Sequence, residues 1–218
     1  MTDEEIHEVM AHFTLASREW VSPAVTIVSQ REGDPFKVLI SCILSLRTHD
    51  RTTGPASERI FSLAPDAATL AELPPEEVER AIYPVGFYRV KAAQIIAIAR
   101  RLCREYGGIV PQGIDELLTF KGVGRKTANL VVTLGYGMPG ICVDTHVHRI
   151  CNRLGYVVTR TPDQTESVLR EKLPSRYWIG INDLLVMCGQ NLCLPVSPRC
   201  SVCPVTRFCP RKGVERWR

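Results

Sequence analysis

Hydrophobic residues recur along the chain at three- and four-residue spacing, which is the pattern of a helix with one buried face. The first such face follows Thr2 and Glu5, which together form a capping box. Asp34 before Pro35 is a second helix start, and residues 36–46 are apolar nearly all round. We therefore expect that helix to run through the middle of the core.

The same spacing predicts further helices along the rest of the chain. They are a short helix opened by Pro74-Pro75, a long one from about Phe87 to Gly107-Gly108, and helices near 114–120, 125–134, 144–152, 164–172 and 177–189. Residues 141–143 are expected to be briefly extended, but no convincing β-hairpin appears. The predicted fold class is all-α.

Composition narrows the class of protein. A chain of 218 residues with 45% hydrophobic and 23% charged residues can bury a real core, which excludes disordered and fibrous proteins. No apolar run approaches the ~18 residues that a membrane span needs. The acidic first residues are unlike a signal or transit peptide. We expect a soluble cytoplasmic protein that is not secreted and has no membrane contact.

Positive charge is concentrated in two segments although the net charge is only +4. Residues 199–218 carry six cations and one acid, and residues 86–105 carry five cations and one acid. The first twenty residues carry one cation and five acids. Basic zones of this kind are typical of proteins that bind a polyanion, although an ordinary solvated face has the same composition.

Four of the nine cysteines fall close together, as Cys193-x6-Cys200-x2-Cys203-x5-Cys209. Four thiolates around one centre suit an iron–sulfur cluster or zinc. Zinc ribbons usually have two C-x2-C pairs and this stretch has one, but the spacing also differs from both common ferredoxin patterns. We favour an iron–sulfur cluster, with zinc and unligated thiols as the alternatives. The remaining cysteines are expected to pack in the core: Cys42, Cys103, Cys142, Cys151 and Cys188.

Two of the short predicted helices are joined by Gly122-Val123-Gly124. Glycine accepts positive φ, so the turn can be tight, and it leaves backbone amides at the start of the second helix. Such amides bind phosphate without reading sequence, and Lys121 and Arg125 would add charge beside them. An ordinary helical hairpin explains the pattern equally well. Eighteen residues after Lys126, Asp144 has the position of a helix N-cap.

Three segments follow one another in an order that resembles the endonuclease III branch of the helix-hairpin-helix DNA glycosylases. They are residues 117–129, residues 143–153 and the cysteine spacing from Cys193 to Cys209. The similarity covers about residues 28–209. Smaller matches to that family are Leu44-Ser45 with Asp50, Gly86-Phe87-Tyr88, Lys91-Ala92 and Val110-Pro111.

The resemblance implies a monomeric, two-lobed protein with a [4Fe–4S] cluster held by the four clustered cysteines. One lobe would be a six-helix barrel of about residues 28–138, with the hairpin at about 113–134. The other would combine residues 1–27 with 139–218 and include the cluster loop, 193–209. Damaged double-stranded DNA would lie across the cleft between the lobes, so in a prokaryote the protein would be associated with the nucleoid.

The resemblance also implies a base-excision-repair glycosylase with AP (apurinic/apyrimidinic) lyase activity, which removes oxidised pyrimidines and nicks the strand by β-elimination. Lys126 would attack C1′ and form a Schiff base, and Asp144 would take its proton or stabilise charge on the sugar. A free lysine titrates near ~10.4. Lys126 would lie beside Arg125 in the first turn of a helix, and both features oppose protonation of its amine. An ionised Asp144 would favour protonation of that amine.

Four further residues are expected to contact DNA because of their places in the family pattern. Phe87 stands where the family carries a wedge residue, although a core aromatic has the same signature. Arg47 replaces a usual glutamine, which leaves the preference for the opposite base open, and Lys121 replaces a usual proline. Arg199 is the cation that remains between the first two clustered cysteines.

Other functions remain open from the sequence. They are a monofunctional thymine or uracil mismatch glycosylase of the same fold, a non-catalytic DNA-binding protein, and a small electron carrier. Lys126 favours lyase chemistry, and an electron carrier has no need of the hairpin. His146 and His148 are expected to pack or decorate a helix.

Overall fold

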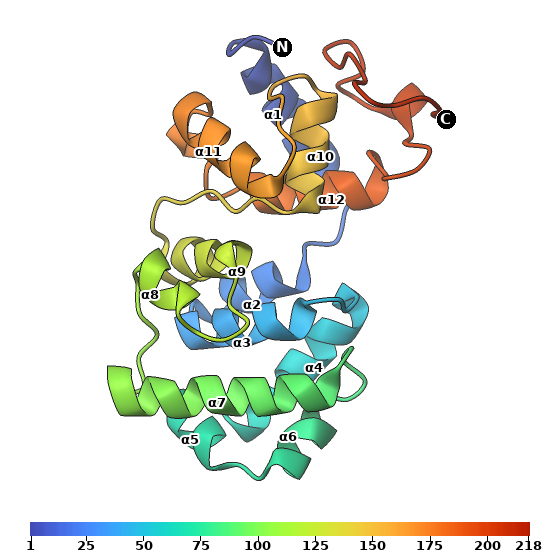
Figure 1. The fold of residues 1–218 in the computed structure, drawn as a ribbon. Helices are drawn as coiled ribbons and strands as arrows, with labels where there is room; N and C mark the ends of the chain where they lie inside the picture. The colour runs from blue at the N-terminus through green and yellow to red at the C-terminus, as the bar shows by residue number, and fades with distance from the viewer. The chain divides into compact units, whose positions relative to one another are not determined.

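The computed structural model describes residues 1–218, except for the side chains of residues 31 and 32. It divides the chain into two compact units: unit 1 combines Met1–Pro23 with Pro139–Arg218, and unit 2 is Ala24–Met138. Helices make up both units (Figure 1), and no strand occurs among the described residues. The predicted all-α class is confirmed.

Unit 2 is built around one apolar helix. Its elements are α2 (Ala24–Glu32), α3 (Pro35–Ser45), α4 (Asp50–Leu63), α5 (Ala67–Glu72), α6 (Pro75–Ile82), α7 (Tyr88–Tyr106), α8 (Ile114–Leu118), α9 (Arg125–Leu130) and a π-helical turn, η1 (Val131–Gly135). The Asp34 side chain caps α3 by accepting from the Phe36 amide at 2.8 Å. Residues 38–44 are all buried, and α3 packs against α2, α4, α7 and α9. The prediction of a central helix is confirmed.

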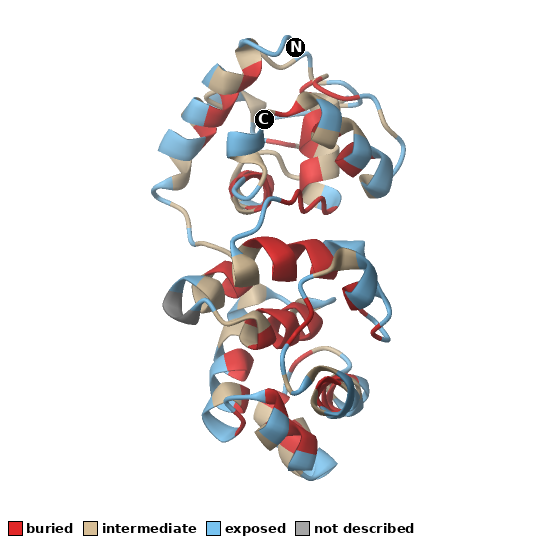
Figure 2. Cartoon of the chain, turned by 90° about the vertical axis from the view of Figure 1, so that its left-hand side faces the viewer, coloured by how far each residue is buried: buried red, intermediate tan, exposed pale blue. Residues whose placement is uncertain are grey.

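Unit 1 joins the amino-terminal helix to the last third of the chain. Its elements are α1 (Glu5–Ser17), α10 (Thr145–Arg153), α11 (Pro162–Lys172), a 3-10 turn η2 (Ser175–Tyr177), α12 (Ile181–Asn191) and a second 3-10 turn η3 (Cys200–Val202). The capping box of α1 is reciprocal, because the Thr2 amide donates to Glu5 Oε2 at 2.7 Å and the Glu5 amide donates to Thr2 Oγ1 at 3.1 Å. In Figure 2 the buried residues of each unit gather on inward helix faces.

Three helices, α2, α4 and α5, are not evident in the sequence. In α4, Gly54 and Pro55 lie inside the helix, where both residues oppose helix formation. Thr53, Ala56 and Ile60 on the opposite face are nevertheless fully buried, so packing overrides local preference. A boundary also differs, because the last long helix begins at Ile181 rather than 177, after a 3-10 turn. Residues 141–143 lie outside the helices.

Two glycines of unit 2 provide a matched test of packing. A Cβ on Gly135 would lie 2.9 Å from Pro35 Cα, whereas a Cβ on Gly54 would meet nothing within 4 Å. Gly135→Ala should therefore lower the free energy of unfolding by about 1–3 kcal/mol. Gly54→Ala, inside α4, should raise it by about 0.5–1 kcal/mol. Urea denaturation measures both, and shifts of the same sign would contradict this packing.

Candidate functional site

The predicted hairpin between α8 and α9 is present and tightly turned. The Val123 amide donates to the Phe120 carbonyl at 3.0 Å, and Gly122 has φ +80°. Gln94 Nε2, on α7, donates to the Lys121 carbonyl at 3.0 Å. The positive φ favours glycine here, and Gln94 Nε2 lies against the position that a Cβ would take. Phe120 and Val123 are buried while Gly122 is exposed, so the tip presents its backbone outward.

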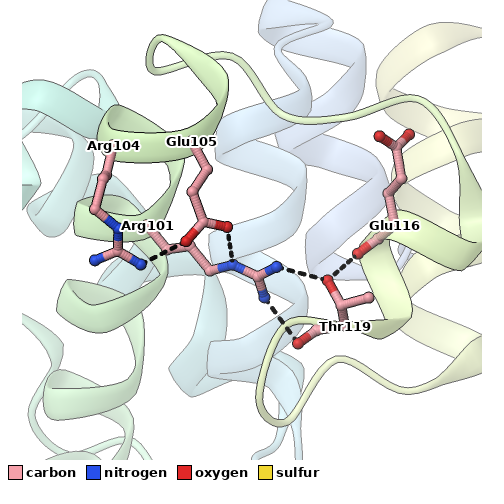
Figure 3. Close-up of polar contacts among 5 residues, drawn as sticks. All are labelled: Arg101, Arg104, Glu105, Glu116 and Thr119. Atoms are coloured by element: carbon pink, nitrogen blue, oxygen red, sulfur yellow. Dashed lines mark hydrogen bonds and ion pairs between the residues drawn. The ribbon is translucent and has the colours of Figure 1, made fainter.

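Arg101 of α7 fastens the hairpin to the long helix (Figure 3). Its two terminal nitrogens donate to the Thr119 carbonyl at 2.8 Å and to Thr119 Oγ1 at 2.9 Å. Its Nε donates to Glu105 at 2.6 Å, and Arg104 donates to the other oxygen of that carboxylate. These hydrogen bonds lower the pKa of Glu105. The guanidinium also lies 4.4 Å from the centroid of the Phe120 ring, which completes the anchor.

Lys126 is the second residue of α9, with Gly124 at the N-cap position and Arg125 beside it. The side chain is exposed, and so are Gly124 and Arg125. Lys126 also lies near α3: burial raises the pKa of the Cys42 thiol to about 12, and the positive charge of Lys126 acts in the opposite direction. The predicted place of Lys126 in the first turn of a helix is confirmed.

Asp144 caps α10, as the sequence predicts. Its Oδ1 accepts from the His146 amide at 2.8 Å and from the Val147 amide at 2.9 Å, and the residue is only 9% exposed. Burial lowers the pKa of Arg149, one turn further along α10, while negative charge on Cys193 and on Asp144 raises it. Lys126 belongs to unit 2 and Asp144 to unit 1.

Arg47 and Phe87 come together on the surface of unit 2, although forty residues separate them. The Arg47 guanidinium lies 5.9 Å from the centroid of the Phe87 ring. Both backbones are left-handed, with φ 52° and 58°, a conformation that costs a non-glycine residue free energy. Phe87 is 62% exposed, so the alternative that it is a core aromatic is wrong.

Lys91 holds the loop that carries Arg47, and the sequence analysis did not assign it this role. Its Nζ donates to the carbonyls of Leu44 at 2.8 Å and Leu46 at 2.5 Å, and to Thr48 Oγ1 at 3.1 Å. Lys91 is 5% exposed, and burial lowers its pKa to about 8. The three acceptors favour the ammonium form, which alone has three protons to donate. The sequence feature that could have indicated this role is the position of Lys91 on the apolar face of the long helix α7.

The four clustered cysteines line one cavity in unit 1, together with Arg153 and Arg211. Arg153 donates to Cys193 Sγ at 3.3 Å and to the Leu194 carbonyl at 2.7 Å. The Nε of Arg211 is buried without a hydrogen-bond partner among the described residues. Four soft thiol donors and three arginines (Arg153, Arg199 and Arg211) around one space fit an anionic iron–sulfur group, which would give that nitrogen a partner.

The other cysteines and histidines have structural surroundings. Cys42, Cys142, Cys151 and Cys188 are buried as predicted, whereas Cys103 is only half-buried, because it lies at the edge of the buried face of α7. The half-buried His148 shares a hydrogen bond of 2.7 Å with Thr165 Oγ1.

Two absences hold for the described part of the chain. It contains no helix long and apolar enough to span a membrane. Nor does it contain a group of three or more His, Cys, Asp and Glu residues arranged around a single metal ion.

Arg199 is exposed in the cluster loop, where its amide donates to the Leu192 carbonyl at 2.9 Å.

The hydrogen bonds of Lys91 predict a large loss of stability in Lys91→Met. The carbonyls of Leu44 and Leu46 would lose a charged donor, which should lower the free energy of unfolding by about 2–4 kcal/mol. Lys121→Met, which replaces an exposed lysine, should change it by less than about 0.5 kcal/mol. Urea denaturation compares the two, and an equal small change in both variants would show that Lys91 does not hold this loop.

Comparisons with known proteins agree with this fold. Residues 40–175 match the family model of the HhH-GPD superfamily base excision DNA repair proteins. Endonuclease III of Thermotoga maritima is 46% identical over 181 residues, which cover 83% of this chain and 85% of that protein. Endonuclease III homolog 2, chloroplastic, of Arabidopsis thaliana is 42% identical over 80% of this chain. The chain spans about half of that longer relative, 48% of its length.

Two solved structures are also similar at 30% sequence identity. A non-covalent endonuclease III–DNA complex has a TM-score of 0.84, with 97% of this chain and 96% of that chain covered. A trapped endonuclease III–DNA covalent intermediate has a TM-score of 0.82, with 97% of each chain covered. The chain therefore belongs to the endonuclease III family of the HhH-GPD superfamily of base excision DNA repair proteins.

Proposed function

We propose that this chain is a DNA glycosylase with AP lyase activity, which removes oxidised pyrimidines from duplex DNA and nicks the strand by β-elimination. The observation that carries the proposal is the exposed Lys126 in the first turn of the second hairpin helix. It supplies a nucleophile in a chain whose fold matches a trapped endonuclease III–DNA covalent intermediate. Such an intermediate needs a group that bonds to DNA, and a lysine amine is suited to attack C1′ of a nucleoside.

The chemistry assigned to Lys126 balances. Its neutral amine forms a bond to C1′ while the C1′–N bond breaks, and the bonding pair leaves with the base, which takes up a proton. Loss of the amine proton and opening of the sugar give an imine. The imine acidifies C2′–H, and removal of that proton expels the 3′ phosphate and nicks the strand. The positive end of α9 and the charge of Arg125 both disfavour protonation of the attacking amine.

Asp144 is proposed to act on the same nucleoside as Lys126, as proton acceptor or as stabiliser of positive charge on the sugar. Two amides at the start of α10 bind its Oδ1 and so fix the plane of the carboxylate. A carboxylate held in this way needs no reorientation when charge develops in the transition state. The cap is thus compatible with a catalytic role.

The DNA contacts are proposed from exposure and charge. The hairpin (Lys121, Gly122, Val123, Gly124 and Arg125) would bind a phosphate through its backbone amides and two cations, and Arg199 would contact phosphate from the cluster loop. Extruding a base costs a few kcal/mol, so a side chain should fill the space left behind. Arg47 and Phe87, exposed and in contact, suit that role.

A [4Fe–4S] cluster is proposed in the cavity lined by Cys193, Cys200, Cys203 and Cys209. When bound, it would cross-link the loop from 193 to 209 with four metal–thiolate bonds. The unpartnered Arg211 Nε supports an anionic occupant. We further propose that the protein acts as a monomer in the compartment that holds DNA, the cytoplasm of a prokaryotic cell.

Borohydride trapping tests the nucleophile. The unaltered protein should become covalently attached to duplex DNA that contains an abasic site, and Lys126→Gln should abolish both trapping and nicking, because an amide cannot form the imine. Lys121→Gln, five residues earlier in the same hairpin, should still be trapped. Trapping of the Lys126→Gln protein would disprove the assignment of Lys126 as the nucleophile.

Asp144→Asn tests the carboxylate. The variant keeps an N-cap and should fold normally, but its rate of base release should fall by about 10²-fold or more.

A panel of duplexes tests the substrate class. Duplexes that contain an oxidised pyrimidine should yield both the free base and a nicked strand, whereas uracil and a G·T mismatch should yield neither. Release of thymine or uracil without a nick would instead identify a monofunctional mismatch glycosylase. Binding without base release would identify a non-catalytic DNA-binding protein. Product strands are separated by electrophoresis with and without alkali, which cleaves any abasic site left by base release alone.

A further inference from the structure

Residues 210–218, here called the closing segment, cover one side of the cysteine cavity. Arg211 and Val214 from this segment line the cavity together with the four clustered cysteines. Its backbone is fastened at both ends. The Lys212 amide donates to the Arg153 carbonyl at 3.1 Å. The Arg218 amide donates to the Pro198 carbonyl at 3.0 Å, and the Arg218 carbonyl accepts from the Ser201 amide at 3.1 Å. The closing segment is therefore attached both to α10 and to the cluster loop.

Arg211 carries two features that are unfavourable without a ligand. Its backbone is left-handed, with φ 56°, and its buried Nε has no hydrogen-bond partner among the described residues. The remainder of the side chain is well held. The guanidinium lies 4.7 Å from the centroid of the Trp217 ring, and Nη2 donates to Thr206 Oγ1 at 3.4 Å. A held side chain with one orphaned donor indicates a group that is bound in the cavity.

The residues that line the cavity identify the charge of that group. The side chains of Arg153, Arg199 and Arg211 line it together with the four clustered cysteines. Arg153 donates to Cys193 Sγ at 3.3 Å. A cluster ligated by four thiolates is an anion, which cations at the cavity wall would stabilise.

We propose that Arg211 donates its Nε–H to a sulfur of the bound iron–sulfur cluster, and that the closing segment holds it in place so that this residue retains the cluster and raises its reduction potential. The inference rests on the proposed presence of the cluster and deepens it. Hydrogen bonds to cluster sulfurs and positive charge beside them stabilise the reduced, more negative state. Arg211 is thus a positioning residue for the cluster, distinct from its four ligands.

Three variants of the full chain test the role of Arg211. Arg211→Met removes charge and donor at nearly constant length, and Arg211→Lys keeps the charge but removes the Nε–H. Arg216→Met is the matched control, since Arg216 is an exposed arginine of the same segment outside the cavity lining. Iron and sulfide per chain, the rate at which visible cluster absorbance is lost in chelator, and the potential in protein-film voltammetry are measured for each. Circular dichroism checks that the helices are intact.

Arg211→Met should lose its cluster about tenfold faster than the unaltered protein, as loss of one charge-assisted hydrogen bond implies, and its potential should shift to more negative values. Arg211→Lys should also lose the cluster faster but with a smaller shift of potential, because the charge remains. Arg216→Met should match the unaltered protein. If Arg211→Met does not fold, the comparison between Arg211→Lys and Arg216→Met decides the question by the same rates.

Two failures are distinguishable. If the iron-loaded Arg211 variants and Arg216→Met lose the cluster at equal rates and have equal reduction potentials, this inference is overturned. The proposal that the protein binds a cluster would remain intact. An unaltered protein that contains neither iron nor sulfide after anaerobic purification would overturn both. Neither result depends on DNA cleavage, so glycosylase activity is tested separately.

Discussion

The start of α9 follows a tight turn at Gly122, and α7 holds that turn through a hydrogen bond from Gln94. The glycine turns the backbone with φ +80°, and Gln94 of α7 lies directly against it while donating to the Lys121 carbonyl. Arg101, two turns further along α7, binds both the carbonyl and the hydroxyl of Thr119. One long helix thus fixes the hairpin on both sides of its tip. The placement of Lys126 and of the amides proposed to bind phosphate depends on this attachment.

Cations also hold the loop beside Arg47 and the loop with the clustered cysteines. Loop carbonyls have no helical partner, and cations on neighbouring helices supply the missing donors. Lys91 binds the carbonyl of Leu44 at the end of α3 and that of Leu46 beside Arg47. Arg149 binds the carbonyl of Cys193, and Arg153 binds those of the next two residues. These cations are therefore engaged inside the protein and are not free to bind DNA. Net charge alone overstates the surface that can bind a polyanion.

Backbone strain coincides with the candidate sites. Among the described residues, the non-glycine residues with positive φ are Arg47, Phe87, Ser197 and Arg211. The first two form the exposed pair proposed to replace an extruded base, and the other two lie in the cluster loop and the closing segment. Left-handed conformations persist only where surrounding contacts impose them, and such contacts are typical of functional sites. Each unit therefore carries its strain where a ligand is proposed to bind.

Local signals in the sequence determined the helical class, the central helix after Asp34, the capping roles of Thr2 and Asp144, the hairpin and the family. The helices, caps and hairpin depend on residues within a few positions of one another, and the family resemblance depends on the order of several such local motifs, so all are visible in one dimension. Tertiary structure alone decided that α4 forms around Pro55, that Lys91 binds the loop with Arg47, and that Arg211 lines the cysteine cavity. In each case the deciding partner comes from another element, so its contribution exists only once the chain has folded and the donor and acceptor have been brought together.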